Sequence, residues 1–129
     1  QALFSLYTKY DSLSRVAVLN YSVELNSIQS NPLWIAVYLK ESEIIAPQLM
    51  PNNSRNETYV HENVFRSAPL GPLGILISQN GGEGGQVFSG SVTSNLDPLW
   101  NAKECEWVII LYDKSNYQVI QPGTTLVYP

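Results

Sequence analysis

Short runs in which apolar and polar residues alternate fill this chain, and no stretch shows the apolar stripe of an amphipathic helix. Roughly eight to ten such runs occur, with turn residues between them at the spacing that antiparallel sandwiches and barrels show. The pattern therefore predicts an all-β domain, an antiparallel β-sandwich that is jelly-roll-like, with about 8–10 short strands.

The two strongest predicted strands cover residues 33–40 and 105–112. The first is apolar on both faces, one of which consists of Trp34, Ala36 and Tyr38. We expect this strand to be central and covered on both sides, or to turn its aromatic face toward a partner.

Other runs predict local detail. The alternation changes phase within residues 15–25, which predicts a β-bulge or a corner. The Pro- and Asn-rich segment 47–56 predicts an exposed loop. A buried strand at 75–77 and a return strand at 86–92 are expected to form a hairpin around the glycine-rich tip 80–85.

The C-terminal part predicts three further features. A single helical turn is expected within 95–104. Strands are expected at 117–120 and 124–128, with a turn at Pro122 and Gly123 between them.

The surface is expected to be covered by uncharged polar groups, because charged residues make up only 14% of the chain against a typical figure of about 25%. The net charge is −4, and the basic residues form no cluster. We therefore expect no nucleic-acid binding by this domain. We also expect no membrane insertion, because the apolar runs are only strand-sized.

The length of 129 residues predicts a single domain, residues 1–129. The chain begins at Gln1 without a methionine or a signal peptide, which suggests a domain excised from a longer chain. Cys105 has no partner cysteine, which favours folding in a reducing compartment. Its place in a strand-like run predicts a small core side chain.

Residues suited to catalysis are sparse. His61 is the single histidine, and no nucleophile–base pair or acid pair can be specified, so we expect no enzymatic activity. The glycine-rich tip lacks the lysine and hydroxyl of a phosphate-binding loop. No cofactor is expected, and the one metal alternative is calcium held between loops by acids among Glu41, Glu43, Asp97, Glu104, Glu106 and Asp113.

Aromatic residues supply the candidate binding residues, because aromatic rings stack on sugars and dominate interfaces. Trp100 lies in a predicted loop with Asp97 and Asn101, and is the first candidate for a contact. Trp34 and Tyr38 are the second. A loop tryptophan that plugs the open end of the sandwich explains Trp100 equally well.

These features together make the chain resemble the protruding (spike) domain of a small non-enveloped RNA virus capsid protein, of the nodavirus-like kind. The resemblance rests on the lightly charged β-domain, the long Asn- and Pro-rich loop 47–56 and the unpaired Cys105. It implies a non-enzymatic domain that folds in the host cytoplasm and is displayed on the virion surface. There it would self-associate as a dimer or trimer and attach to a host-surface receptor or glycan.

Two other functions fit the same residues. A carbohydrate-binding module or lectin-like sandwich would use Trp100 or Trp34 and would bind sugar as an isolated domain. An adhesion or scaffold module of a multidomain protein is the other alternative.

Overall fold

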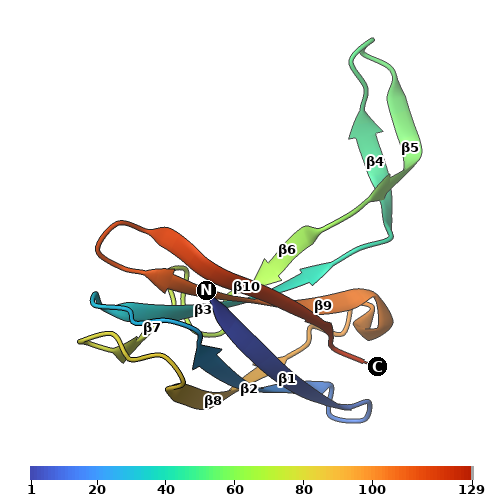
Figure 1. Cartoon of the computed structure of the whole chain (residues 1–129). Helices are drawn as coiled ribbons and strands as arrows, with labels where there is room; N and C mark the ends of the chain where they lie inside the picture. Colours follow the sequence, from blue (N-terminus) through green and yellow to red (C-terminus); the bar gives the residue numbers. More distant parts are fainter. Residues whose placement is uncertain (129) are drawn as a thin grey trace.

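The computed structural model describes residues 1–128, and strands form almost all of its regular secondary structure (Figure 1). The described residues form ten strands and one 3₁₀ turn: β1 (Ala2–Asp11), β2 (Val16–Leu25), β3 (Leu33–Glu41), β4 (Ile44–Leu49), β5 (Arg55–His61), β6 (Val64–Ser67), β7 (Ile75–Ser78), β8 (Val87–Asn95), η1 (Ala102–Glu104), β9 (Cys105–Asp113) and β10 (Gln118–Leu126). The 3₁₀ turn confirms the helical turn predicted within 95–104.

Two antiparallel sheets pack against each other. One has three strands in the order β1-β2-β8. The other has five, in the order β10-β9-β3-β6, with β7 paired to β3 beside β6. β1 packs near β10, where the two sheets approach each other. The predicted antiparallel β-sandwich is confirmed.

The core lies between the sheets and uses one face of each strand. β3 is central, because β9 pairs with one side and β6 and β7 with the other. The fully buried side chains of the core include Leu33, Ile35, Val37, Leu39, Leu19, Val23, Leu25, Trp107, Ile109 and Leu111. Each such side chain contributes roughly 1.5–3 kcal/mol on burial. Cys105 is also fully buried, which confirms its predicted core position.

β2 runs without the predicted bulge. It pairs with β1 in one register from Val16 to Leu25, and Ala17 and Leu19 face the core together with Tyr21. The apparent change of phase arose because the outward positions Val16 and Val18 are also apolar, so alternation alone did not identify the inner face.

The predicted hairpin between 75–77 and 86–92 is wrong. β7 pairs with β3, whereas β8 pairs with β2, so the glycine-rich segment crosses from one sheet to the other. Ile75 and Leu76 are 42% and 44% exposed rather than buried, because β7 is a short strand at the margin of its sheet.

The predicted turn at Pro122 and Gly123 is also wrong, because β10 is one continuous strand with an irregularity between Val119 and Gln121. Proline is tolerated there because β10 is an edge strand, paired only with β9, and a missing N–H on the free side costs no ladder hydrogen bond.

The segment predicted as an exposed loop folds instead into a β-hairpin. β4 and β5 pair from Ile44↔His61 to Leu49↔Arg55, with an irregularity around Pro47. We call residues 44–61 the arm. Figure 1 shows the arm standing away from the body on the side of the five-stranded sheet, and β4 and β5 pack chiefly on each other. The prediction of exposure is confirmed, since every residue from 51 to 60 is exposed.

Candidate functional site

Aromatic rings gather on the outward side of the five-stranded sheet. We call Trp34, Tyr38, Phe65, Tyr112 and Tyr117 the aromatic face. Trp34 and Tyr112 are register partners with ring centroids 6.5 Å apart, and Tyr117 stacks on Tyr112 at 6.2 Å and 17°. Tyr38 and Phe65 form a second pair at 6.1 Å. Such pairs stabilise by about 0.5–1.5 kcal/mol beyond their buried area.

Lys114 brings a positive charge to this surface. Its Nζ lies 4.4 Å from the ring centroid of Trp34 and 4.7 Å from that of Tyr117. Both distances are within the range of a cation–π interaction, which partly compensates the charge. The Lys114 ammonium group therefore packs on the aromatic rings and forms part of the same surface.

The loop 68–74 holds two of the rings in place. The Tyr38 hydroxyl donates to the Pro72 carbonyl at 2.6 Å, and the Tyr112 hydroxyl donates to the Leu73 carbonyl at 2.5 Å. Burial raises the pKa of Tyr112, so this phenol stays protonated and able to donate. Ala36, between Trp34 and Tyr38 on β3, is only 2% exposed. The rings of Tyr38 and Tyr112 are thus held in position by the loop.

The surface around these rings is apolar and open to solvent. Phe65 is 61% exposed, the neighbouring margins of the sheet add exposed Leu76, Val119 and Leu126, and the loop 68–74 adds exposed Leu73. Exposed apolar side chains grouped on one side of a sheet are a feature of interaction sites.

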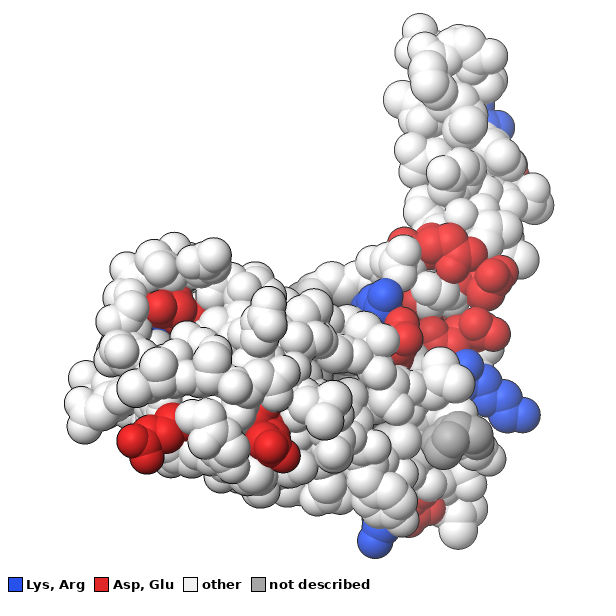
Figure 2. All heavy atoms as spheres, in the orientation of Figure 1, with Lys and Arg blue, Asp and Glu red and all other residues white. Residues whose placement is uncertain are grey.

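The arm carries exposed apolar residues of its own. Ile45 and Leu49 are 67% and 65% exposed, and Tyr59 and Val60 are exposed as well. The charged side chains Arg55 and Glu57 pair with each other at 2.8 Å. The arm is therefore close to neutral along its length, as Figure 2 shows.

The stem of the arm is tied to the body. Lys40 Nζ donates to Asn63 Oδ1 at 2.8 Å, and the Asn63 N–H donates to Ser42 Oγ at 3.0 Å. The Ser42 N–H donates in turn to the Glu104 carbonyl at 3.0 Å. Glu43 and Asn63, one on each connection, have left-handed φ values of 57° and 55°. These contacts set the direction in which the arm leaves the sandwich.

Acidic side chains surround this stem, and Figure 2 shows them where the arm meets the body. A hydrogen bond with Glu62, followed by the repulsion of its charge, raises the pKa of Glu43. Within residues 1–128, no group of three or more His, Cys, Asp or Glu side chains could hold a metal ion.

The structure gives Trp100 a place at one end of the sandwich, packed against the core. Asp97 Oδ1 accepts the Leu99 N–H at 2.9 Å, and Asn101 Oδ1 accepts the Lys103 N–H at 3.2 Å. The structure brings these predicted residues together, but their side-chain oxygens already serve the local backbone. This arrangement favours a structural role for Trp100, closing one end of the sandwich, over a role in contacting a partner. Binding by Trp100, Asp97 and Asn101 stays a prediction.

Trp34 and Tyr38 belong to a different surface, since both lie on the outward side of β3. Sequence reasoning missed their partners Phe65, Tyr112 and Tyr117. The outward phase of the alternation in 105–113 was the signal for Tyr112, because Trp107, Ile109 and Leu111 take the inward phase.

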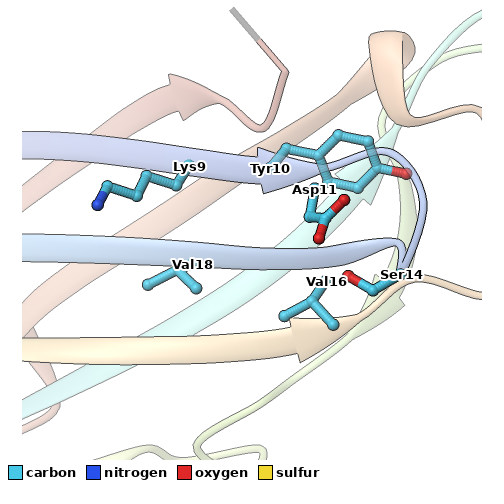
Figure 3. Close-up of a pocket in the computed structure, with 6 residues that line it drawn as sticks. All are labelled: Lys9, Tyr10, Asp11, Ser14, Val16 and Val18. Atoms are coloured by element: carbon cyan, nitrogen blue, oxygen red, sulfur yellow. The ribbon is translucent and has the colours of Figure 1, made fainter.

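The three-stranded sheet has an open hollow of about 700 Å³ on its outer side (Figure 3). Lys9, Tyr10, Asp11, Ser14, Val16 and Val18 line it. Asp11 Oδ1 accepts the Leu13 N–H at 3.0 Å, and this bond lowers the pKa of Asp11. Figure 3 shows the Lys9 side chain extending away from Asp11, so no polar groups converge on a ligand position.

Comparisons with known proteins show the fold alone. No family model matches the chain, and no curated protein matches it. The chain is similar to the crystal structure of a domain of the outer membrane lipoprotein Omp28 from Porphyromonas gingivalis. The TM-score is 0.62 at 16% identity, over 99% of this chain and 88% of that one. A second solved structure, the structural-genomics target SoR45, has a TM-score of 0.36 at 11% identity, over 99% and 87% of the two chains, and carries no argument.

The described part of the chain holds no helix long and apolar enough to cross a membrane.

Proposed function

We propose that this domain is a non-enzymatic recognition domain that self-associates by exchanging arms. The arm of one copy lies on the aromatic face of a second copy, and the second copy returns the contact. The observation that carries this proposal is the arm itself, a two-stranded ribbon that stands clear of the body (Figure 1). An isolated hairpin is only marginally stable in water, so an arm of this kind gains most by lying against another surface.

The charges of the two surfaces agree with such a contact. The charged side chains of the arm are paired with each other, and the ammonium group of Lys114 rests on Trp34 and Tyr117. Burial of the arm against the aromatic face therefore brings in one ammonium group, that of Lys114, whose charge the rings of Trp34 and Tyr117 compensate in part. What comes together is mainly apolar, such as Ile45 from the arm and Phe65 from the face.

The number of residues available for the contact agrees with the size of a stable interface. The arm spans 18 residues, from 44 to 61, and the aromatic face with the exposed apolar residues beside it adds further contact residues from the body. A stable interface uses about 20–30 residues on each side. A reciprocal exchange would bring both surfaces of both copies into one such interface.

The solved domain of similar fold belongs to a protein that is described as an outer membrane lipoprotein. Display on a virion and attachment to a host receptor stay predictions from the resemblance to virus spike domains. Binding of a glycan through the aromatic residues is the alternative, and the isolated domain would then bind sugar without self-association.

Sedimentation over a concentration series tests the arm exchange with two substitutions at exposed sites. Ile45→Asp on the arm and Phe65→Asp on the face should each weaken the contact at least tenfold, about 1.4 kcal/mol. Leu13→Asp is the matched control, because Leu13 is 95% exposed at the β1–β2 turn, away from both surfaces. If both variants associate like the control, the proposal is wrong.

A further inference from the structure

The edge of the three-stranded sheet at β8 lacks the protection against strand pairing that the other edges of the two packed sheets have. Natural strands at edges are usually protected against pairing by charge, proline, a bulge or short length. β10 has Pro122 and an irregular register, β6 and β7 have four residues each, and β1 has Lys9 and packs near β10. β8 has nine residues, Val87 to Asn95, without a charged residue or a proline.

The direction of the β8 backbone groups follows from two hydrogen bonds at its ends. The Leu96 N–H donates to the Arg15 carbonyl at 2.9 Å, and the Gln86 carbonyl accepts the Leu25 N–H at 3.0 Å. Both bonds point toward β2. Because direction alternates along a strand, every second residue between them also points toward β2. The remaining residues point their N–H and C=O groups away from the sheet: Val87, Ser89, Ser91, Thr93 and Asn95.

Side chains hold this edge in a fixed position. Val92 and Leu96 are 3% and 4% exposed, so the inner side of the strand is anchored in the core. Tyr21 lies over Gly90, its register partner, so closely that a Cβ atom there would be 2.4 Å from the tyrosine hydroxyl oxygen. The edge-facing residues Ser89, Ser91 and Thr93 are exposed. β8 thus presents an ordered row of backbone donors and acceptors to solvent.

We propose that β8 pairs antiparallel with β8 of a second copy, about a two-fold axis at Ser91. The two three-stranded sheets then join into one continuous sheet. In this register Ser91 lies opposite the partner's Ser91, and Ser89 lies opposite the partner's Thr93. Val87 lies opposite the partner's Asn95, so every edge-facing N–H and C=O of the strand gains a hydrogen-bond partner.

The sequence of the edge favours a second copy as the occupant. The residues brought opposite each other at the centre are hydroxyl-bearing, and cross-strand Ser and Thr pairs are favourable. No like charges meet, because the strand has none. The strand is in this sense complementary to itself.

This contact and the arm exchange use different layers of the sandwich. β8 belongs to the three-stranded sheet, whereas the arm and the aromatic face belong to the side of the five-stranded sheet (Figure 1). One copy can therefore make both contacts at once. Two different two-fold contacts on each copy give assemblies larger than a dimer. The β8 pairing does not require the arm exchange.

Cysteine cross-linking tests the pairing and its register. Cys105 is fully buried with its pKa raised to about 11, so an introduced thiol is the reactive one. Ser91→Cys should give a disulfide-linked dimer on mild oxidation, because Cα atoms in such a pair lie about 5.5 Å apart. Ser5→Cys, exposed on the same sheet but on β1, is the control.

The register predicts a second result. Ser89→Cys alone should not cross-link, but a mixture of Ser89→Cys and Thr93→Cys proteins should form the mixed dimer. If Ser91→Cys cross-links no more than Ser5→Cys, the pairing is wrong. If Ser89→Cys alone cross-links as well as Ser91→Cys, the register is wrong.

Sedimentation separates this pairing from the arm exchange. Ser91→Pro removes an edge-facing N–H without breaking a bond to β2, and Ser91→Ala keeps that N–H. With both contacts intact we expect species larger than a dimer. The single variants Ser91→Pro and Ile45→Asp should each form a dimer. The double variant should be a monomer. If Ser91→Pro leaves the mass unchanged while Ile45→Asp lowers it, the β8 pairing is overturned and the arm exchange stands. The reverse result overturns the arm exchange alone.

Discussion

Glu41 and Arg66 form an ion pair at the end of β3 that points toward the arm. Arg66 Nε lies 2.9 Å from Glu41 Oε1, and Glu41 is only 4% exposed. The other carboxylate oxygen accepts the Asn101 N–H at 2.9 Å. The Arg66 guanidinium lies 5.7 Å from the ring centroid of Trp100. One buried carboxylate therefore joins β3, β6 and the Trp100 loop.

Removing that carboxylate should destabilise the domain. Glu41→Ala leaves Arg66 and the Asn101 amide without their partner, and loss of one member of a buried pair costs about 3 kcal/mol. Urea unfolding measures the change. The control is Glu106→Ala, which breaks the 3.2 Å pair with Lys40 between partly exposed side chains. Glu106→Ala should lower the free energy of unfolding by less than about 1 kcal/mol. Equal losses of unfolding free energy in the two variants would show that burial of the ion pair does not set the size of the loss.

Trp100 should act as a plug rather than as a contact residue. Because its ring packs against the core, Trp100→Ala should lower the free energy of unfolding by about 3 kcal/mol. Leu99→Ala next to it should change it little, since Leu99 is 92% exposed. A Trp100→Ala protein that keeps its stability but loses sugar or partner binding would restore the contact role.

The loop over the aromatic face should depend strongly on one glycine. Gly74 has a φ of +83°, and a Cβ atom there would be 2.0 Å from the Ile35 carbonyl oxygen. Gly71, with a φ of +88°, has nothing within 4 Å. Gly71→Ala should therefore cost only the conformational strain of about 1 kcal/mol. Gly74→Ala should lower the melting temperature much further, and a similar melting temperature for the two variants would contradict this close approach.

The stem of the arm should respond to pH. A hydrogen bond that protonated Glu43 donates to Glu62, and then the charge of Glu62, raise the pKa of Glu43 above its ordinary value. A carboxyl group with a raised folded-state pKa contributes stability below its unfolded pKa, and this contribution is lost as pH rises through the folded value. The pair therefore repels at neutral pH.

Glu62→Gln removes this repulsion. After correction for intrinsic rates, amide hydrogen exchange in the arm should slow at neutral pH and change little in acid, below the ordinary pKa of the pair. Glu57→Gln, at the Arg55 pair away from the stem, is the control. Equal slowing by both variants, or slowing that is as large in acid, would rule out the stem pair as the cause.

Cys105 should be unreactive in the folded protein. Burial is the main reason that its pKa is raised to about 11, and the charge of Glu41 adds to this effect. A thiol-specific disulfide reagent at pH 8 should label Cys105 only as fast as the domain unfolds, and at once in denaturant. Rapid labelling of the folded domain would mean that the β9 end of the core opens locally.

Strand pairing was the part of the fold that the sequence left open. Residues 75–77 and 86–92 read as one hairpin because they are neighbours in the chain, yet β7 pairs with β3 and β8 with β2. Alternation reports which face of a strand is buried and carries no information on its partner. The arm was read as a loop for a similar reason, because Pro47, Asn52 and Asn53 are turn formers in any context.

The sequence by itself determined the all-β class, the central strand β3, the buried Cys105 and the apolar inner faces of β3 and β9. Each of these follows from local alternation, because a side chain's neighbours two positions away share its face. Only the tertiary structure decided that the arm stands clear, that the aromatic residues of four segments form one face, and that β8 ends its sheet unprotected. These features depend on contacts between residues far apart in the chain, which are fixed by the packing of two sheets rather than by any local pattern.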